Sequence, residues 1–225
     1  MVRLVLFDID GTLIQSGGAG EQAFARVCAT EFNVPHGADR LRFAGRTDPG
    51  IVREFFQRHE IELSRDNFRR FFDSYVFWLE HLLHQTGGRI LPGVPDLLDG
   101  MRALPEPPMI GLLTGNIRLG AQIKLTHYEL WGEFRTGGFG DDDEDRNGIA
   151  VVARNRGSGL LQRDLLGEEV LVIGDTPLDI GCARAIDARV LAVATGSYRL
   201  DQLQDHHPTW AVPNLQEVCV KEVCG

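Results

Sequence analysis

The stretch RLVLFDIDGT at residues 3–12 joins an apolar run to two aspartates and a glycine. The run at 3–7 predicts a short buried strand that ends at Asp8. Asp8 and Asp10 are two residues apart, so their side chains leave an extended chain in the same direction, and Gly11 permits a sharp turn after them. Because two like charges this close repel, a cation or a shared proton must offset the repulsion. The stretch therefore predicts a charged site at the carboxyl end of a strand.

Further apolar runs follow from residue 109 onward, and stretches with helical spacing separate them. The predicted strands are 109–114, 134–139, 170–173, 189–195 and 209–212, and the predicted helices between them are 118–126, 148–156 and 180–186. Strands and helices that alternate at this spacing are typical of βαβ units, which form a parallel sheet covered by helices on both faces. The sequence therefore predicts an α/β fold that binds ligands beyond the carboxyl ends of its strands.

Residues 15–90 interrupt this alternation, because they contain no convincing strand and have helical character. Apolar side chains recur at helical spacing over 19–32 and 65–84, and phenylalanines gather between Phe43 and Phe77. Long insertions in compact domains are usually functional. We therefore predict a helical cap at 15–90 over the carboxyl edge of the sheet, inserted into a core of 1–14 and 91–225. The alternative is a long helical hairpin that packs elsewhere.

Composition narrows the class of protein. The chain has 225 residues, of which 43% are apolar and 24% are charged, as in a typical soluble globular protein. The net charge is −9, and no basic stripe offsets it, so we expect no nucleic-acid partner. The first apolar run is too short for a signal peptide or a membrane span, and the four cysteines are scattered. We therefore expect a cytoplasmic protein that does not engage a membrane.

Two more aspartates follow the apolar run at 170–173. Asp175 comes directly after Gly174, and Asp179 is four residues further on. In a parallel sheet both would lie at the same edge as Asp8 and Asp10. Four carboxylates at one edge need a hard divalent cation, and Mg²⁺ is typically held by one or two carboxylates, several waters and a substrate phosphate. The sequence therefore predicts a Mg²⁺ site that involves Asp8, Asp10, Asp175 and Asp179.

The run at 109–114 ends in Thr114-Gly115-Asn116, directly ahead of a predicted helix. This segment offers a hydroxyl, a side-chain amide and free backbone N–H groups, and a helix N-terminus of this kind favours an anion such as phosphate. A D-x-D pair alone occurs by chance in surface loops. Three strand ends that together supply a nucleophile, an anion site and a metal site indicate a catalytic centre for phosphate chemistry.

Three motifs carry a resemblance to a known family. DIDGT at 8–12, LLTGN at 112–116 and GDTPLD at 174–179 resemble the ordered motifs of the haloacid dehalogenase-like hydrolase superfamily, most closely its phosphoglycolate phosphatase-like branch. The resemblance covers essentially the whole chain, including the insertion after the first motif. It implies a Rossmann-like core with a helical cap, and a Mg²⁺-dependent phosphatase. The implied substrate is a small phosphorylated metabolite, a phosphoglycolate-like monoester, hydrolysed through an aspartyl-phosphate.

The resemblance also assigns roles to the aspartates. It makes Asp8 the nucleophile, and Asp10 the group that protonates the leaving alcohol and then deprotonates the attacking water. Asp175 would bind Mg²⁺ with the Asp8 carboxylate and the Asp10 backbone carbonyl, and Asp179 would support the metal through water or indirectly. This agrees with chemical expectation, because Mg²⁺ screens the repulsion between a carboxylate and a phosphate, and covalent catalysis splits one difficult displacement into two.

The phosphate-binding residues follow from the same resemblance, with one departure. Thr114 and the N–H of Gly115 would hold the transferring phosphoryl oxygens. The family also uses a cation to neutralise the nucleophile and the phosphate, but the usual Lys-Pro pair after the third strand is missing here. Arg146 occupies roughly that place, whereas Lys124 follows ten residues after Thr114. We favour Lys124, because an ammonium is a compact point charge, and keep Arg146 as the alternative.

Two polar stretches allow a structural or a functional interpretation. In the turn at 45–48, Arg46 could reach the non-reacting end of the substrate, or Thr47 or Asp48 could simply cap a helix. The acidic run at 141–145 resembles a metal site, but five consecutive like charges are more often a solvated loop, and we favour the loop. Arg146 could equally be a solvated partner of this run.

Other activities compete with the phosphatase. Dehalogenases of the superfamily work without Asp10 and the metal, and phosphonate hydrolases need a cap lysine, which residues 15–90 lack. Phosphomutases retain both aspartates and therefore stay an alternative. A non-catalytic phosphoryl-binding switch of the receiver type is a second alternative, although receivers are shorter, have no cap and carry the phosphorylated aspartate in the middle of the chain.

Overall fold

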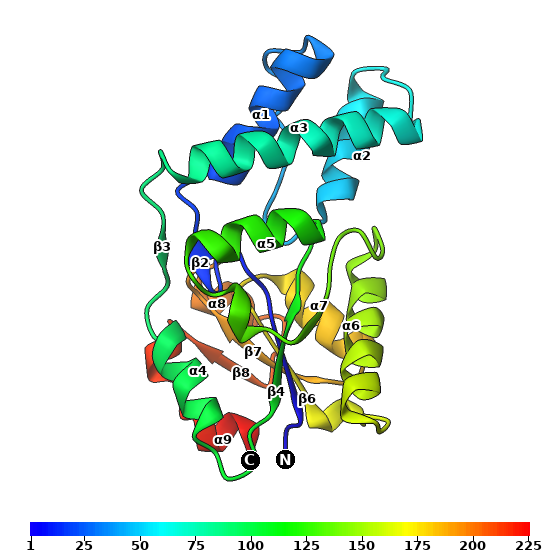
Figure 1. Ribbon diagram of the computed structural model, residues 1–225. Coiled ribbons are helices and arrows are strands. Elements are labelled where there is room, and N and C mark those ends of the chain that lie inside the picture. The colour runs from blue at the N-terminus through cyan, green and yellow to red at the C-terminus, as the bar shows by residue number, and fades with distance from the viewer.

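The computed structural model describes residues 1–225 and contains a six-stranded sheet in which every neighbouring pair is parallel. The strands in spatial order are β5 (Thr136–Gly138), β4 (Met109–Leu113), β1 (Leu4–Phe7), β6 (Val170–Gly174), β7 (Arg189–Val193) and β8 (Trp210–Val212) (Figure 1). Apolar runs that are buried on both faces form the central strands, as expected for a parallel sheet. The predicted α/β fold is confirmed.

Helices cover both faces of the sheet. One face carries α4 (Val94–Arg102), α5 (Arg118–His127) and α9 (Val220–Cys224), and the other carries α6 (Arg146–Leu161), α7 (Pro177–Ala185) and α8 (Leu200–Gln204). Val5 and Phe7 of β1 belong to the first apolar cluster, whereas Leu4 and Leu6 belong to the second. This division follows from the alternation of side chains along a strand, which sends every second residue to the same face.

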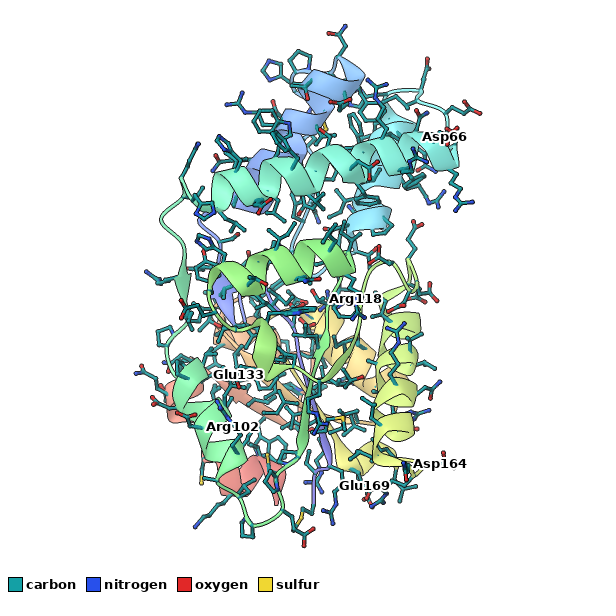
Figure 2. The ribbon with its side chains drawn as sticks, in the orientation of Figure 1. Asp66, Arg102, Arg118, Glu133, Asp164 and Glu169 are labelled. Atoms are coloured by element: carbon teal, nitrogen blue, oxygen red, sulfur yellow. The ribbon has the colours of Figure 1, made fainter.

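Short elements complete the core. They are the 3-10 helices η1 (Trp131–Glu133), η2 (Gly167–Glu169) and η3 (Leu215–Glu217). Arg102 of α4 reaches η1, and its Nη2 lies 3.1 Å from Oε2 of Glu133 (Figure 2). None of the helices combines the length and the apolar character that crossing a membrane requires.

The insertion after β1 consists of three helices and a two-stranded ladder. The helices are α1 (Ala19–Phe32), α2 (Asp48–Arg58) and α3 (Arg65–Leu83), and the antiparallel ladder joins β2 (Ile14–Gln15) to β3 (Arg89–Ile90). The three helices lie together beyond the sheet, with α5 between α3 and the sheet (Figure 1). We propose that this ladder marks the boundary of the cap at 15–90.

The phenylalanines of the insertion form an apolar cluster of their own. The ring centroids of Phe24 and Phe71 are 4.6 Å apart, and Phe55 and Phe56 are fully buried in the same cluster. Ile117, at the start of α5, also belongs to it. Such aromatic packing buries a large apolar area, so the insertion has its own core and is joined to the sheet mainly through α5.

Side-chain caps shift some helix boundaries from the predicted ones. Asp145 accepts a hydrogen bond from the N–H of Asn147 at 3.0 Å, so α6 begins at Arg146 and not at the predicted residue 148. The strand predicted at 134–139 is reduced to β5. Its Gly138 lets α6 approach closely, because a Cβ there would lie 2.5 Å from the carbonyl oxygen of Ile149.

Candidate active site

The register of the sheet brings three predicted site residues to one edge. Phe7, the last residue of β1, pairs with the penultimate residues of β4 and β6. The chain therefore leaves these neighbouring strands at Asp8, Thr114 and Asp175, all on the side of the sheet that faces the insertion (Figure 1). This is the edge at which α/β sheets bind their ligands.

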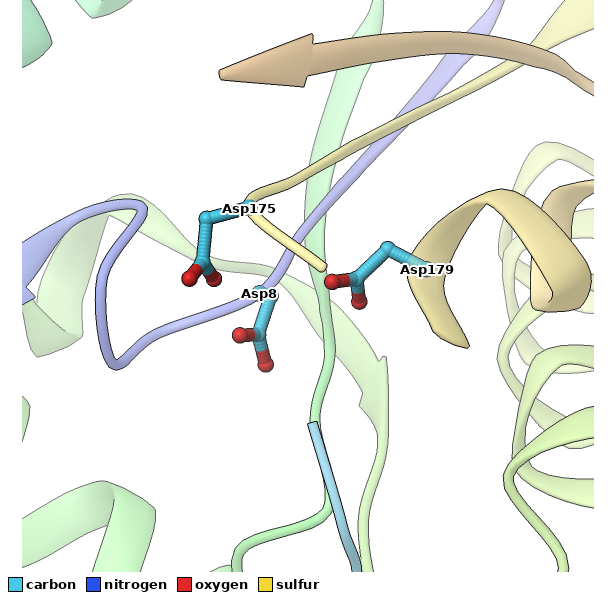
Figure 3. A group of neighbouring side chains, drawn as sticks. All are labelled: Asp8, Asp175 and Asp179. Atoms are coloured by element: carbon cyan, nitrogen blue, oxygen red, sulfur yellow. The ribbon is translucent and has the colours of Figure 1, made fainter. Parts of the chain in front are cut away.

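Asp8, Asp175 and Asp179 form a buried cluster of carboxylates (Figure 3). Their exposed fractions are 5%, 3% and 0%, and each offers an oxygen within 4.8 Å of the others. Burial raises the pKa of Asp8 to about 6, and burial together with the neighbouring carboxylates raises the pKa of Asp175 to about 9. A hard divalent cation would relieve this repulsion, so the oxygen donors present fit Mg²⁺.

The two oxygens of Asp179 already have protein partners. Its Oδ2 accepts hydrogen bonds from the N–H of Thr176 at 3.0 Å and from the Thr176 hydroxyl at 2.7 Å, which caps α7. Its Oδ1 is paired with the Arg146 guanidinium. Asp8 and Asp175 therefore keep more oxygen capacity for a metal than Asp179 does.

Arg146 is the buried cation of this cluster. It is the first residue of α6, and its Nη2 lies 3.1 Å from Oδ1 of Asp8 while also contacting Asp179. Nη1 donates to the carbonyl of Gly45 in the insertion at 3.0 Å, and Nε has no partner among protein atoms. A single guanidinium nitrogen therefore bridges the two carboxylates through charge-assisted contacts. Arg146 is thus turned toward the cluster and away from the acidic run.

Asp10 lies in a second group of polar side chains, on the α5 side of the site. Its Oδ2 accepts hydrogen bonds from Lys124 Nζ at 2.5 Å and from Asn116 Nδ2 at 2.9 Å, and Lys124 also donates to Asn116 Oδ1 at 2.6 Å. Lys124 is only 4% exposed, whereas the side chain of Asp10 is 40% exposed. The Asp10 side chain therefore faces the open part of the site, and the buried Lys124 binds it on its other side.

Thr114 and Gly115 keep donors free for a ligand. The Thr114 hydroxyl oxygen accepts two hydrogen bonds from Asn116, one from Nδ2 at 2.8 Å and one from the backbone N–H at 3.3 Å. The hydroxyl proton is therefore free to donate to a ligand. The N–H of Gly115 donates to no protein group, while its carbonyl accepts the N–H of Asp48 at 2.8 Å. A Cβ at Gly115 would overlap the carbonyl of Arg46, so only glycine allows the insertion to approach this closely.

The turn at 45–48 caps a helix, which is the structural one of the two interpretations of its sequence. Thr47 caps α2, with its hydroxyl oxygen accepting the N–H of Gly50 at 3.3 Å. The Arg46 guanidinium is paired with Glu54 and also donates to the carbonyl of Gly50 at 3.3 Å. Arg46 borders the site, but its charge is directed along α2.

The acidic run at 141–145 is exposed except for a half-buried Asp142. Its members bind backbone N–H groups or arginines: Asp142 binds Arg156, Glu144 binds Arg53, and Asp145 caps α6. These bonds account for the run as part of the loop and the helix start, as the preferred interpretation expected.

Side chains that the sequence did not single out complete the site. The Thr12 hydroxyl donates to Asp175 Oδ1 at 3.3 Å, and a Cβ at Gly11, whose φ is +87°, would lie 2.5 Å from the same carboxylate. Tyr75 of α3 also borders the site. Thr12 belongs to the DIDGT stretch, so the sequence could have indicated a role for it in the site. Tyr75 belongs to an apolar pattern with helical spacing, which indicates only packing.

These residues surround one cavity of about 430 Å³. Its walls come from the sheet edge and from the insertion, with Asp8, Asp175 and Thr114 on one side and Phe24, Phe43 and Tyr75 on the other. A volume of this size accommodates a small metabolite. Two segments that are distant in the sequence therefore enclose one polar site.

Comparisons with known proteins agree with this geometry. The family model of the haloacid dehalogenase-like hydrolases matches residues 5–184, and a HAD-hydrolase-like model matches residues 151–218. The probable phosphatase IndB of Dickeya dadantii (strain 3937) is 24% identical over 223 residues, which is 97% of this chain and 92% of that protein.

Solved structures show the same fold. A hydrolase from Pseudomonas syringae has a TM-score of 0.76 at 20% identity, with 100% of each chain covered. A predicted phosphoglycolate phosphatase from Haemophilus somnus has a TM-score of 0.70 at 19% identity, with 95% of each chain covered. Because the first family model spans most of this chain and all three motifs, the chain belongs to the haloacid dehalogenase-like hydrolase family.

Proposed function

We propose that this enzyme is a Mg²⁺-dependent phosphatase that hydrolyses a small phosphate monoester through an aspartyl-phosphate on Asp8. The observation that carries the proposal is the buried Asp8, which has Asp175 within reach of a shared cation and the Arg146 guanidinium 3.1 Å away. A carboxylate held at a cavity wall with a guanidinium beside it to neutralise charge is suited to attack phosphorus. Mg²⁺, held by Asp8 and Asp175, would neutralise charge and orient the phosphate.

The protein's own donors would hold the phosphate for attack. The free N–H of Gly115 and the Thr114 hydroxyl lie just after the end of β4. Asp8 lies just after the end of β1, which is the neighbouring strand. Preorganised donors of this kind stabilise the charge that develops on phosphoryl oxygens, at no cost of reorganisation. Asn116 fixes the Thr114 hydroxyl through two hydrogen bonds and so positions it.

Asp10 would transfer protons in both half-reactions. It is two residues after Asp8 and faces the open part of the cavity, with Lys124 and Asn116 both bound to its Oδ2. Its other oxygen would give a proton to the departing alcohol as the bond from Asp8 to phosphorus forms. The same oxygen would then accept a proton from the water that attacks the aspartyl-phosphate, which releases inorganic phosphate and restores Asp8.

The contacts support Arg146, and not the initially favoured Lys124, as the residue that neutralises the nucleophile. Arg146 contacts Asp8 directly, whereas the carboxylate bound by Lys124 is that of Asp10. Lys124 would then position Asp10 for proton transfer. Asp179, bound by Arg146 and Thr176, would orient Arg146 and act on the metal only indirectly.

The test is the variant Asp8→Asn, assayed with an aryl phosphate in the presence of Mg²⁺. We expect a loss in kcat on the order of 10⁴-fold or more, because an amide oxygen is a poor nucleophile. Circular dichroism checks that the variant is folded. Release of inorganic phosphate by the unmodified enzyme separates hydrolysis from a phosphomutase, and multiple turnover separates it from a phosphoryl-binding switch. Retained turnover in Asp8→Asn would contradict the mechanism.

A further inference from the structure

The cations around the cavity are all bound to protein groups. Only three cationic side chains border it, and each has anionic or carbonyl partners. Arg146 contacts Asp8 and Asp179, Lys124 contacts Asp10, and Arg46 is paired with Glu54 outside the cavity. An anionic group at the non-reacting end of a substrate would therefore find no free cation.

Acidic side chains, in contrast, border the cavity without an ion-pair partner. Glu21 of α1 is exposed and forms no ion pair, and Asp48 at the start of α2 accepts only the N–H of Ile117, at 2.8 Å. Both belong to the inserted helices, and Asp48 lies where the insertion meets the loop after β4, since its N–H also binds the carbonyl of Gly115 at 2.8 Å. A second anion on the substrate would face these carboxylates, whereas a hydroxyl or an ammonium would donate to them.

Tyr75 supplies a hydroxyl that opens onto the same cavity. The residue is 3% exposed, borders the cavity, and its hydroxyl has no hydrogen-bond partner in the protein. The hydroxyl lies near Lys124, because a Cβ placed on Gly20 would be 3.5 Å from the Tyr75 oxygen and 3.6 Å from Lys124 Nζ. An unpartnered hydroxyl that opens onto a cavity can donate to or accept from a hydrogen-bonding group on the ligand.

We propose that the substrate's leaving group carries hydroxyl or ammonium donors and no anionic group. The inference rests on the proposed phosphatase function and defines its substrate class. The leaving alcohol would lie between Tyr75 and the carboxylates of Glu21 and Asp48, with the apolar wall of Phe24 and Phe43 beside its carbon chain. This class differs from phosphoglycolate, whose leaving group bears a carboxylate.

Three phosphate monoesters with two-carbon leaving groups provide the test, because they differ only in the terminal group. They are phosphoglycolate, 2-hydroxyethyl phosphate and 2-aminoethyl phosphate, which end in a carboxylate, a hydroxyl and an ammonium. We expect kcat/KM to be at least about tenfold lower for the carboxylate than for the other two. Equal values for all three, or a preference for the carboxylate, would overturn the inference. An enzyme inactive on these esters and on an aryl phosphate would instead disprove the phosphatase proposal.

Variants then locate the selectivity. The selectivity is measured as kcat/KM for the ammonium ester divided by kcat/KM for the carboxylate ester. Glu21→Gln should lower this ratio by about fivefold, because it removes one negative charge and an exposed charge interacts only weakly with the substrate. Glu80→Gln on α3 is the matched control, since Glu80 is exposed and does not border this cavity, and it should leave the ratio unchanged. Equal ratios in the two variants would contradict a role for Glu21.

Tyr75→Phe removes only the hydroxyl and keeps the ring in the apolar cluster. We expect a lower kcat/KM for the hydroxyl ester, about tenfold, as the paired donor or acceptor is lost. The same variant should change kcat/KM for the aryl phosphate less, because an aryl leaving group offers no such hydrogen bond. An equal loss on both substrates would assign Tyr75 to packing alone and overturn its part in recognition.

Discussion

The two sides of the cavity each contain one buried cation, but the cations bind different groups. On the α6 side, Arg146 bridges Asp8 and Asp179 and also binds a carbonyl of the insertion. On the α5 side, Lys124 holds Asp10 and the amide of Asn116. A planar guanidinium can bind two carboxylates at once, whereas an ammonium is a single point charge. Two cations with similar burial therefore have different partners.

Each side also connects to the insertion in its own way. Arg146 reaches it through the carbonyl of Gly45. Lys124 reaches it through α5, whose first turn packs in the aromatic cluster of the insertion, and through the neighbouring Tyr75. The insertion is therefore linked to Asp8 through Arg146 on one side and to Asp10 through Lys124 on the other.

Of the two buried cations, Arg146 is expected to give the larger effect, because Arg146→Met leaves Asp8 and Asp179 without their cation. We expect kcat for an aryl phosphate to fall by about 10³-fold, since a preorganised charge at the reacting group is lost. Arg146→Lys should recover part of this, because its ammonium keeps the charge but has no second nitrogen to bind the carbonyl of Gly45 at the same time. Thermal unfolding of both variants checks the fold. A larger loss from Lys124→Met than from Arg146→Met would reverse the two assignments.

Lys124→Met should have a smaller effect, a loss of about 10- to 100-fold in kcat, because it disturbs the positioning of Asp10 and leaves Asp8 untouched. The loss should appear in kcat more than in KM. The pH profile of kcat should also change, since the partner of the acid–base residue is gone. An unchanged profile with a raised KM would instead assign Lys124 to substrate binding.

The carboxylate cluster makes Mg²⁺ binding dependent on pH. In the metal-free protein the pKa of Asp8 is about 6 and that of Asp175 about 9, both above their value near 4 in an unfolded chain. The folded state thus holds more protons, and its stability falls as pH rises from about 4 toward 9. Because Mg²⁺ requires deprotonated carboxylates, it should raise Tm more at about pH 8 than at about pH 5. A Mg²⁺ effect independent of pH would contradict a site at these aspartates.

The smallest effect is expected where the insertion meets the acidic run. Arg53 Nε lies 2.8 Å from Glu144, and both side chains are more than a third exposed. Arg53→Ala should therefore change the free energy of unfolding by less than about 1 kcal/mol. We expect at most a few-fold change in KM, measured with the aryl phosphate. A large loss of kcat would contradict this expectation and would show that the contact between Arg53 and Glu144 is needed to position the insertion over the site.

The sequence was sufficient for the central strands and for the acids that follow them. Buried runs such as 109–113 and 170–174 are contiguous in the chain, and in a parallel sheet the residues after them must share an edge. Helix ends were less predictable, because a cap such as that of Asp145 on α6 depends on one side-chain hydrogen bond. The carboxylate that each of the two cations binds was not predictable, since neither Lys124 nor Arg146 is near its partner in the sequence.

The order of motifs and the alternation of apolar runs by themselves determined the α/β fold, the inserted helices and the candidate nucleophile Asp8. Only the tertiary structure decided which cation contacts which carboxylate, that Arg46 is turned away toward Glu54, and that Tyr75 borders the cavity. The physical reason is the distance along the chain: apolar runs and helical spacing are set by neighbouring residues, whereas buried charges pair with residues far away in the sequence, where packing and desolvation select their partners.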